Sequence, residues 1–214
     1  MRKSLWCVLL LELLGLGVAM VYAQNTVALL NTLYNAESTG NVLTLTEHLY
    51  IPAAICQNAT AITEWSTPTS NPAVAACITG SNTQRGVLDF ADGSDLSAQW
   101  SMFLPADWTS TIDVRVYWHT TATAGDVVWQ VQSICVADAE TADPAFNTAS
   151  TVTDTAKGTT LQFNTASITT LTVTGCAASE VLFLKVRRDS AHASDTLAAT
   201  ARLVGVEVTY RRAI

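Results

Sequence analysis

The sequence predicts an all-β fold, an antiparallel, jelly-roll-like β-sandwich of about eight to nine strands. Three observations carry this prediction: strict apolar/polar alternation in neighbouring segments, turn signals at short and regular intervals, and no interior stretch with helical periodicity. The alternation is strongest in residues 111–119 and 127–135. The positions that we expect to face the core are Ile112, Val114, Val116, Trp118, Val127, Trp129 and Val131.

Residues 1–23 have the layout of a cleavable secretory signal peptide. Arg2 and Lys3 precede an apolar run, and the segment ends at Ala23 with the small-residue pattern of a cleavage site. The alternative is an uncleaved membrane anchor, but Glu12 in the middle of the run would cost roughly 2.5–3.5 kcal/mol at the bilayer centre. We therefore expect a secreted, periplasmic or extracellular protein that has no membrane contact after signal cleavage.

The rest of the chain is predicted to be one domain, residues 41–214, after an N-terminal arm or short helix at 24–40. Residues 86–212 are its best-defined core. A first strand ends at Pro52, and residues 57–85 are rich in Thr, Ser, Asn, Pro and Gly, which indicates surface loops around one short strand. Besides the two alternating segments, strands are expected at 86–90, 99–104, 148–155, 159–164, 168–173, 181–187 and 202–211.

Four cysteines follow the signal peptide, and an even number in an exported chain indicates disulfides. Three pairings are open. We favour Cys56–Cys77, which are close in sequence, and Cys135–Cys176, which would link two strand ends. A zinc site is the alternative, but no pair has C-x-x-C spacing and no histidine lies nearby in the sequence.

The charge of the chain excludes two classes of partner. The net charge is −7 and only 14% of residues are charged, so the surface is acidic, with polarity supplied mainly by Thr, Ser, Asn and Gln. Nucleic-acid binding depends on Lys and Arg that neutralise phosphates, and this chain has no basic run. An acidic surface also argues against an anionic membrane face.

Three motifs occur together in the second half of the chain: W-x-x-x-L-P-x-D at 100–107, A-x-A-G-x-V-x-W at 122–129 and RD-x5-DT at 188–196. In these motifs residues 86–212 resemble a family of uncharacterised β-sandwich proteins found in bacterial secreted proteins and in phage structural or tail-fibre proteins. The resemblance implies a jelly-roll-like module that assembles as an oligomer, such as a homotrimer. It implies no catalytic residues. The signal peptide and the cysteines depart from a phage particle assembled in a reducing cytoplasm.

No catalytic constellation is evident. His192 lies among Ser190, Ser194, Asp189 and Asp195, but a single loop supplies neither a held nucleophile nor an oxyanion hole. A structural role is favoured, in which Arg187 or Arg188 pairs with Asp189 or Asp195 across the turn. The glutamates of the exported chain stand in no recognisable glycosidase motif, and we expect no enzyme; they are Glu37, Glu47, Glu64, Glu140, Glu180 and Glu207.

Two sets of residues are candidates for binding. Asp89, Asp92 and Asp95 surround Gly93, and oxygen-rich loops of this kind can hold a structural calcium ion, although ordinary turns have the same composition. Exposed aromatic side chains with polar neighbours stack on sugars, and the candidates are Trp65, Trp108, Tyr117 and His119. The predicted function is a non-catalytic exported module for surface attachment, ligand binding or oligomeric assembly. The alternative is a carbohydrate-binding domain or a carbohydrate-active enzyme.

Overall fold

The computed structural model describes residues 44–213, so the predicted signal peptide and N-terminal arm lie outside the described residues. Every regular element in this range is a β-strand. The strands are β1 Thr44–Pro52, β2 Ile55–Gln57, β3 Thr60–Ile62, β4 Val74–Thr79, β5 Gln84–Phe90, β6 Ser97–Phe103, β7 Trp108–His119, β8 Asp126–Val136, β9 Ser150–Thr155, β10 Asn164–Ile168, β11 Val181–Arg188 and β12 Ala201–Ala213.

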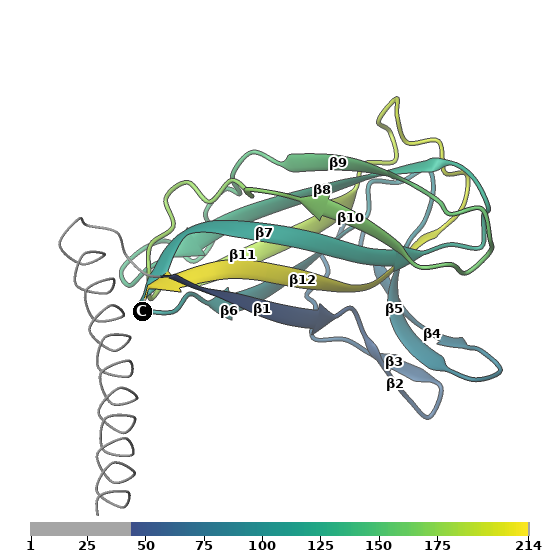
Figure 1. The fold of residues 1–214 in the computed structure, drawn as a ribbon, viewed down its shortest axis with the longest axis horizontal. Coiled ribbons are helices and arrows are strands. Elements are labelled where there is room, and N and C mark those ends of the chain that lie inside the picture. Colours follow the sequence, from purple (N-terminus) through teal and green to yellow (C-terminus); the bar gives the residue numbers. More distant parts are fainter. Residues whose placement is uncertain (1–43, 214) are drawn as a thin grey trace, which may run out of the picture. The chain divides into compact units, whose positions relative to one another are not determined.

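The strands form two main antiparallel sheets and one small hairpin (Figure 1). The first sheet has the order β10-β7-β12-β5-β4, and β1 also pairs with β12. The second has the order β6-β11-β8-β9, while β2 pairs only with β3. The predicted all-β, antiparallel, jelly-roll-like sandwich is confirmed.

Two stretches of the chain differ from the sequence prediction. Residues 57–85 were expected to hold one short strand, but the segment contains β3, β4 and the start of β5. Figure 1 shows the β2–β3 and β4–β5 hairpins projecting from the sandwich, and Cys56–Cys77 joins the two. In the other stretch, strands were expected at 159–164 and 168–173, but the structure has one strand, β10, between them. Residues 156–163 and 169–180 form turns and loops.

One hydrophobic core lies between the sheets, and the seven predicted core residues are all buried in it. The Trp118 ring on β7 meets the Trp129 ring on β8 edge to face, with centroids 6.3 Å apart. The Phe90 ring on β5 also meets Trp129 edge to face, with centroids 5.1 Å apart. Since burying one large apolar side chain contributes about 1.5–3 kcal/mol, these aromatic contacts are a main link between the sheets.

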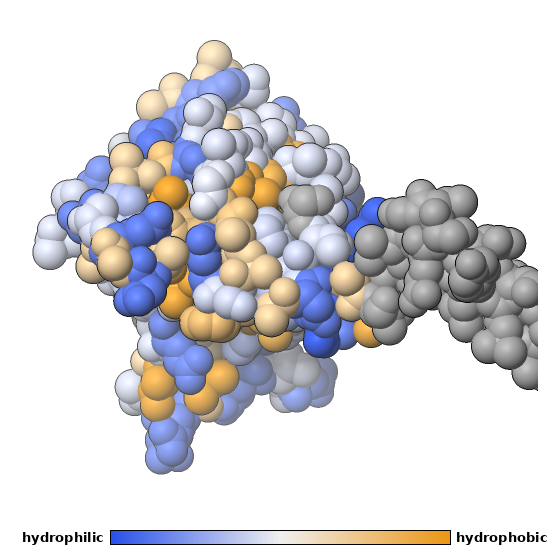
Figure 2. All heavy atoms as spheres, turned by 90° about the vertical axis from the view of Figure 1, so that its left-hand side faces the viewer, coloured by the Kyte–Doolittle hydropathy of each residue, from blue (hydrophilic) through white to orange (hydrophobic). Residues whose placement is uncertain are grey.

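Figure 2 shows one face of the molecule, on which hydrophilic and hydrophobic residues are mixed. The part that projects at the bottom of Figure 2 also carries hydrophobic residues. In the β2–β3 hairpin the cross-strand pair Ile55 and Ile62 is exposed. In residues 44–213 we find no helix with the length and apolar character of a membrane span.

Candidate ligand-binding face

Trp65, predicted as a sugar contact in a loop, is instead a core residue with 4% exposure. Ser66 forms a bridge with Gln99 that adds the chain as a short extension to the β6 edge. Glu64 and Ser66 then point outward and Trp65 points inward, because neighbours alternate in an extended chain. The Trp65 Nε1 donates to the Pro52 carbonyl at 2.9 Å, which satisfies the buried indole.

Trp108 is also poorly placed for stacking. It begins β7, is half-buried and packs against the core. Its Nε1 is buried and has no hydrogen-bond partner among the described residues. Its ring therefore belongs to the end of the sandwich and not to an open face.

Tyr117, the third aromatic candidate, faces outward from the first sheet and has a partner that the sequence did not reveal. The Tyr50 ring on β1 meets the Tyr117 ring edge to face, with centroids 6.1 Å apart and an interplanar angle of 66°. Tyr50 is 52% exposed. We call the outward side of β1, β12, β7 and β10 the tyrosine face. Its two cross-strand rows are Tyr50, Glu207, Arg115 and Ser167, and beside them Gly205, Tyr117 and Thr165.

Glu207 organises the polar part of the tyrosine face. The Tyr117 hydroxyl donates to Glu207 Oε2 at 2.7 Å, Arg115 donates to the same oxygen at 3.1 Å, and His48 Nδ1 lies 2.9 Å from Oε1. The pKa of Glu207 is lowered, chiefly because the Tyr117 hydroxyl bonds to its carboxylate, with burial partly opposing and His48 and Arg115 adding to the effect. A fixed carboxylate thus holds three polar groups of the face in place.

Gly205 determines where the Tyr50 ring lies. A Cβ at this position would be 2.4 Å from the Tyr50 hydroxyl oxygen and 2.5 Å from its Cζ. The Tyr50 side chain therefore lies directly over the backbone of β12, and its hydroxyl donates to the Val204 carbonyl at 3.3 Å. Any larger residue at position 205 would displace the ring.

His119 lies on the outward side of β7, as predicted, but it is completely buried and not exposed. The Phe163 ring lies 6.0 Å from the imidazole, and Arg202 is its cross-strand neighbour. Neither ring nitrogen has a hydrogen-bond partner in residues 44–213. Burial, followed by the nearby cations Arg85 and Arg202, lowers the pKa of His119 to about 4. The imidazole is neutral at pH 7 and does not offer a surface contact.

The three aspartates proposed for calcium do not come together as one ligand set. Instead each has an arginine partner: Asp89 pairs with Arg202 at 3.4 Å, Asp92 with Arg188 at 3.4 Å and Asp95 with Arg187 at 3.0 Å. Among residues 44–213 no group of three or more His, Cys, Asp or Glu side chains is arranged to hold a metal ion. Calcium binding by these residues stays a prediction.

The loop around His192 is ordered by a buried ion pair. Arg188 and Asp195 both have fully buried side chains and form two hydrogen bonds, at 3.1 and 2.7 Å. Asp195 also accepts the Val128 amide at 3.0 Å, while the His192 Nδ1 accepts only the local Ser194 amide. The predicted pairing across the turn is confirmed, and the Asp195 carboxylate forms no hydrogen bond with the His192 imidazole.

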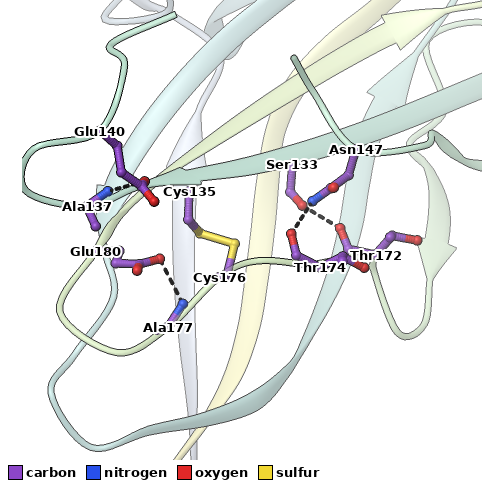
Figure 3. The surroundings of a disulfide bond; sticks show 10 residues. All are labelled: Ser133, Cys135, Ala137, Glu140, Asn147, Thr172, Thr174, Cys176, Ala177 and Glu180. Atoms are coloured by element: carbon purple, nitrogen blue, oxygen red, sulfur yellow. Dashed lines mark hydrogen bonds between the residues drawn. A yellow bond between two sulfur atoms is a disulfide. The ribbon is translucent and has the colours of Figure 1, made fainter. Parts of the chain in front are cut away.

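Both predicted disulfides are formed, with Cα–Cα distances of 5.6 Å for Cys56–Cys77 and 5.0 Å for Cys135–Cys176. Figure 3 shows the second, which ties the end of β8 to the loop before β11. Glu140 and Glu180 lie beside it, and each accepts a backbone amide three residues earlier at 2.8 Å. These two glutamates stabilise turns.

No protein-family model and no curated protein sequence matches the chain. Among solved structures, the chain is similar to a family 11 carbohydrate-binding module from Clostridium thermocellum in complex with a β-1,3-1,4-mixed-linked tetrasaccharide, with a TM-score of 0.40, 6% identity, and coverage of 74% of this chain and 95% of that chain. It is also similar to the CBM22-1 xylan-binding domain of Xyn10C from Paenibacillus barcinonensis, with a TM-score of 0.40, 9% identity and coverage of 78% and 95%. A third similar structure is TmCBM61 in complex with β-1,4-galactotriose, with a TM-score of 0.35, 11% identity, and coverage of 71% of this chain and 88% of that chain. Similarities this low support no conclusion about the ligand of this chain.

Proposed function

We propose that this chain is an exported, non-catalytic β-sandwich module that binds a glycan on the tyrosine face. One observation carries the proposal: Tyr50 and Tyr117 form an outward-facing pair on the first sheet, beside a hydrogen-bonded cluster of polar side chains. Both disulfides support export, because such bonds persist in oxidising compartments.

The chemistry of the face suits a sugar. A pyranose ring presents C–H groups on its faces and hydroxyl groups around its rim, so it stacks on an aromatic ring while its rim is hydrogen-bonded. The tyrosines supply aromatic surface. Arg115 and His48, whose side chains are 52% and 59% exposed, supply polar atoms at the edge. Because Glu207 already holds these side chains in place, they lose little conformational entropy when a ligand binds.

The same cluster argues against glycoside hydrolysis at this face. A general acid must be protonated at the working pH, which requires a raised pKa. The pKa of Glu207 is lowered instead, and both its oxygens already accept hydrogen bonds. Glu207 is therefore suited to orienting neighbours and not to proton transfer.

A glycan array followed by calorimetry tests the proposal. The protein is compared with Tyr50→Ala, Tyr117→Ala and the control Phe103→Ala, which removes an aromatic ring of 65% exposure from the opposite sheet. Loss of one stacking surface should weaken binding roughly tenfold, since this corresponds to about 1.4 kcal/mol. The control should bind as wild type does. An array without any bound glycan, or affinity unchanged in both tyrosine variants, would overturn the proposal.

A further inference from the structure

A cavity of about 380 Å³ lies on the outer face of the second sheet, on the other side of the sandwich from the tyrosine face. This volume is within the range of roughly 300–1,000 Å³ that is typical of small-ligand sites. The residues that line it are Glu64, Ser66, Gln99, Trp100, Ser101 and Phe183.

The cavity exists because the chain adds a short extension to the edge of β6. The Ser66 amide donates to the Gln99 carbonyl at 2.8 Å, and the Gln99 amide donates back at 2.7 Å. Cross-strand neighbours share a face, so Ser66 and Gln99 point outward together. Ser101 and Phe183, which are cross-strand partners on β6 and β11, form the next outward row. Glu64, two residues before Ser66, faces the same side.

The polar side chains of this cavity are not used by the fold. The carboxylate of Glu64, the amide of Gln99 and the hydroxyls of Ser66 and Ser101 form no hydrogen bond with another described residue, whereas the polar groups of the tyrosine face are bonded to each other. Lys185, beside Gln99, is held over the Phe146 ring at 4.6 Å. The cavity therefore combines an aromatic surface with four polar side chains that have no partner within residues 44–213.

We infer that this cavity is a second binding site, which takes one or two rings of a neutral, hydroxylated ligand such as a short glycan. Each sugar hydroxyl both donates and accepts, and the amide and the serine hydroxyls can do the same, while the carboxylate accepts. The Phe183 ring offers a stacking surface for the C–H face of the ligand. The site shares no residue with the tyrosine face and does not depend on it, so a chain with both would contact two glycan segments and gain avidity.

Backbone and side-chain amide NMR of the protein produced from the full-length sequence tests the inference. The probes are methyl glycosides of glucose, galactose, mannose, xylose and N-acetylglucosamine at millimolar concentration. At least one should shift the Gln99 side-chain amide and the Ser101 backbone amide in a saturable way. Phe183→Ala should weaken this binding at least about tenfold, a loss of roughly 1.4 kcal/mol. Ile134→Ala, which lies in the same cross-strand row but outside the cavity lining, should leave it unchanged.

A variant with both Tyr50→Ala and Tyr117→Ala separates this site from the proposed function. The shifts at Gln99 and Ser101 should persist in it, even where binding to the tyrosine face is lost. No shift at these residues with any probe would overturn the inference, and so would shifts that are equally strong in Phe183→Ala.

Discussion

Replacing Asp195 with Asn tests whether the buried ion pair orders the loop between β11 and β12. Asn has nearly the same shape as Asp, so the substitution removes the charge without opening a cavity. Arg188 would remain fully buried and lose its only buried carboxylate partner among the described residues. Its remaining bonds go to the backbone carbonyls of Phe90, Leu197 and Ala199 and, at 3.4 Å, to the half-exposed Asp92. Removing one partner of a buried ion pair costs about 3–5 kcal/mol.

The structure supplies a matched control in Asp92, which pairs with the same guanidinium. Its distance to Arg188 is 3.4 Å and its side chain is 48% exposed, so Asp92→Asn should cost less than about 1 kcal/mol. In a domain of this size a loss of 1 kcal/mol lowers Tm by about 2–4 °C. We therefore expect Asp195→Asn to lower Tm by about 6 °C or more, measured by thermal and urea unfolding.

Equal midpoints for the two variants would refute the reasoning, since only Asp195 is fully buried and forms two hydrogen bonds with the guanidinium. The double variant Arg188→Met with Asp195→Leu supplies a second check. Replacing both buried charges with apolar side chains removes the unpaired ion, so the double variant should be more stable than Asp195→Asn. A double variant that is less stable would show that the backbone bonds of Arg188, and not its charge balance, stabilise the loop.

Two further predictions concern stability. The pKa of His119 is about 4 in the folded protein and 6.5 in the unfolded chain. Between pH 4 and pH 6.5 the unfolded chain therefore binds more protons at this residue than the folded protein does. The unfolding free energy should rise with pH across this range. His119→Leu should flatten this rise relative to wild type and to His192→Gln in urea unfolding; equal slopes would contradict the assignment. Replacing both Cys135 and Cys176 with Ala opens a link across 41 residues and should cost about 4 kcal/mol in the chain-entropy model. An unchanged urea midpoint would show that the surrounding turns hold the loop without it.

The sandwich could be predicted because its strands follow one local rule. In β7 and β8, period-two alternation assigns Ile112, Trp118 and Trp129 to the interior, and burial agrees. The rule is less informative where strands are three to six residues long, as in the segment that forms β2 to β4. There the register depends on Cys56–Cys77 and on tertiary pairing, which a local pattern does not contain.

The candidate site was only partly predictable, because outward parity is not the same as exposure. Tyr117 and His119 share a face, but Phe163 lies against His119, whereas Tyr50 leaves its own ring open beside Tyr117. Phe163 and Tyr50 are distant from β7 in the sequence. Trp65 was misassigned for the related reason that a loop can add to a sheet edge and thereby alternate like a strand. The tyrosine pair becomes visible only when β1 is placed on β12.

A bulge in β12 brings the tyrosine face together. Simple alternation places Val204, Val206 and Val208 on one inward side, but the pairing with β7 shifts between Leu203 and Gly205. Val204 is the extra residue, so Leu203 before it and Val206 after it can both face the core. Without the shift, core burial at Leu203 would require the residues after it to reverse faces, and Glu207 would point into the core. The bulge therefore lets the residues before it and after it both fill the core. It also places Glu207 at the centre of the outward row and Gly205 beneath Tyr50.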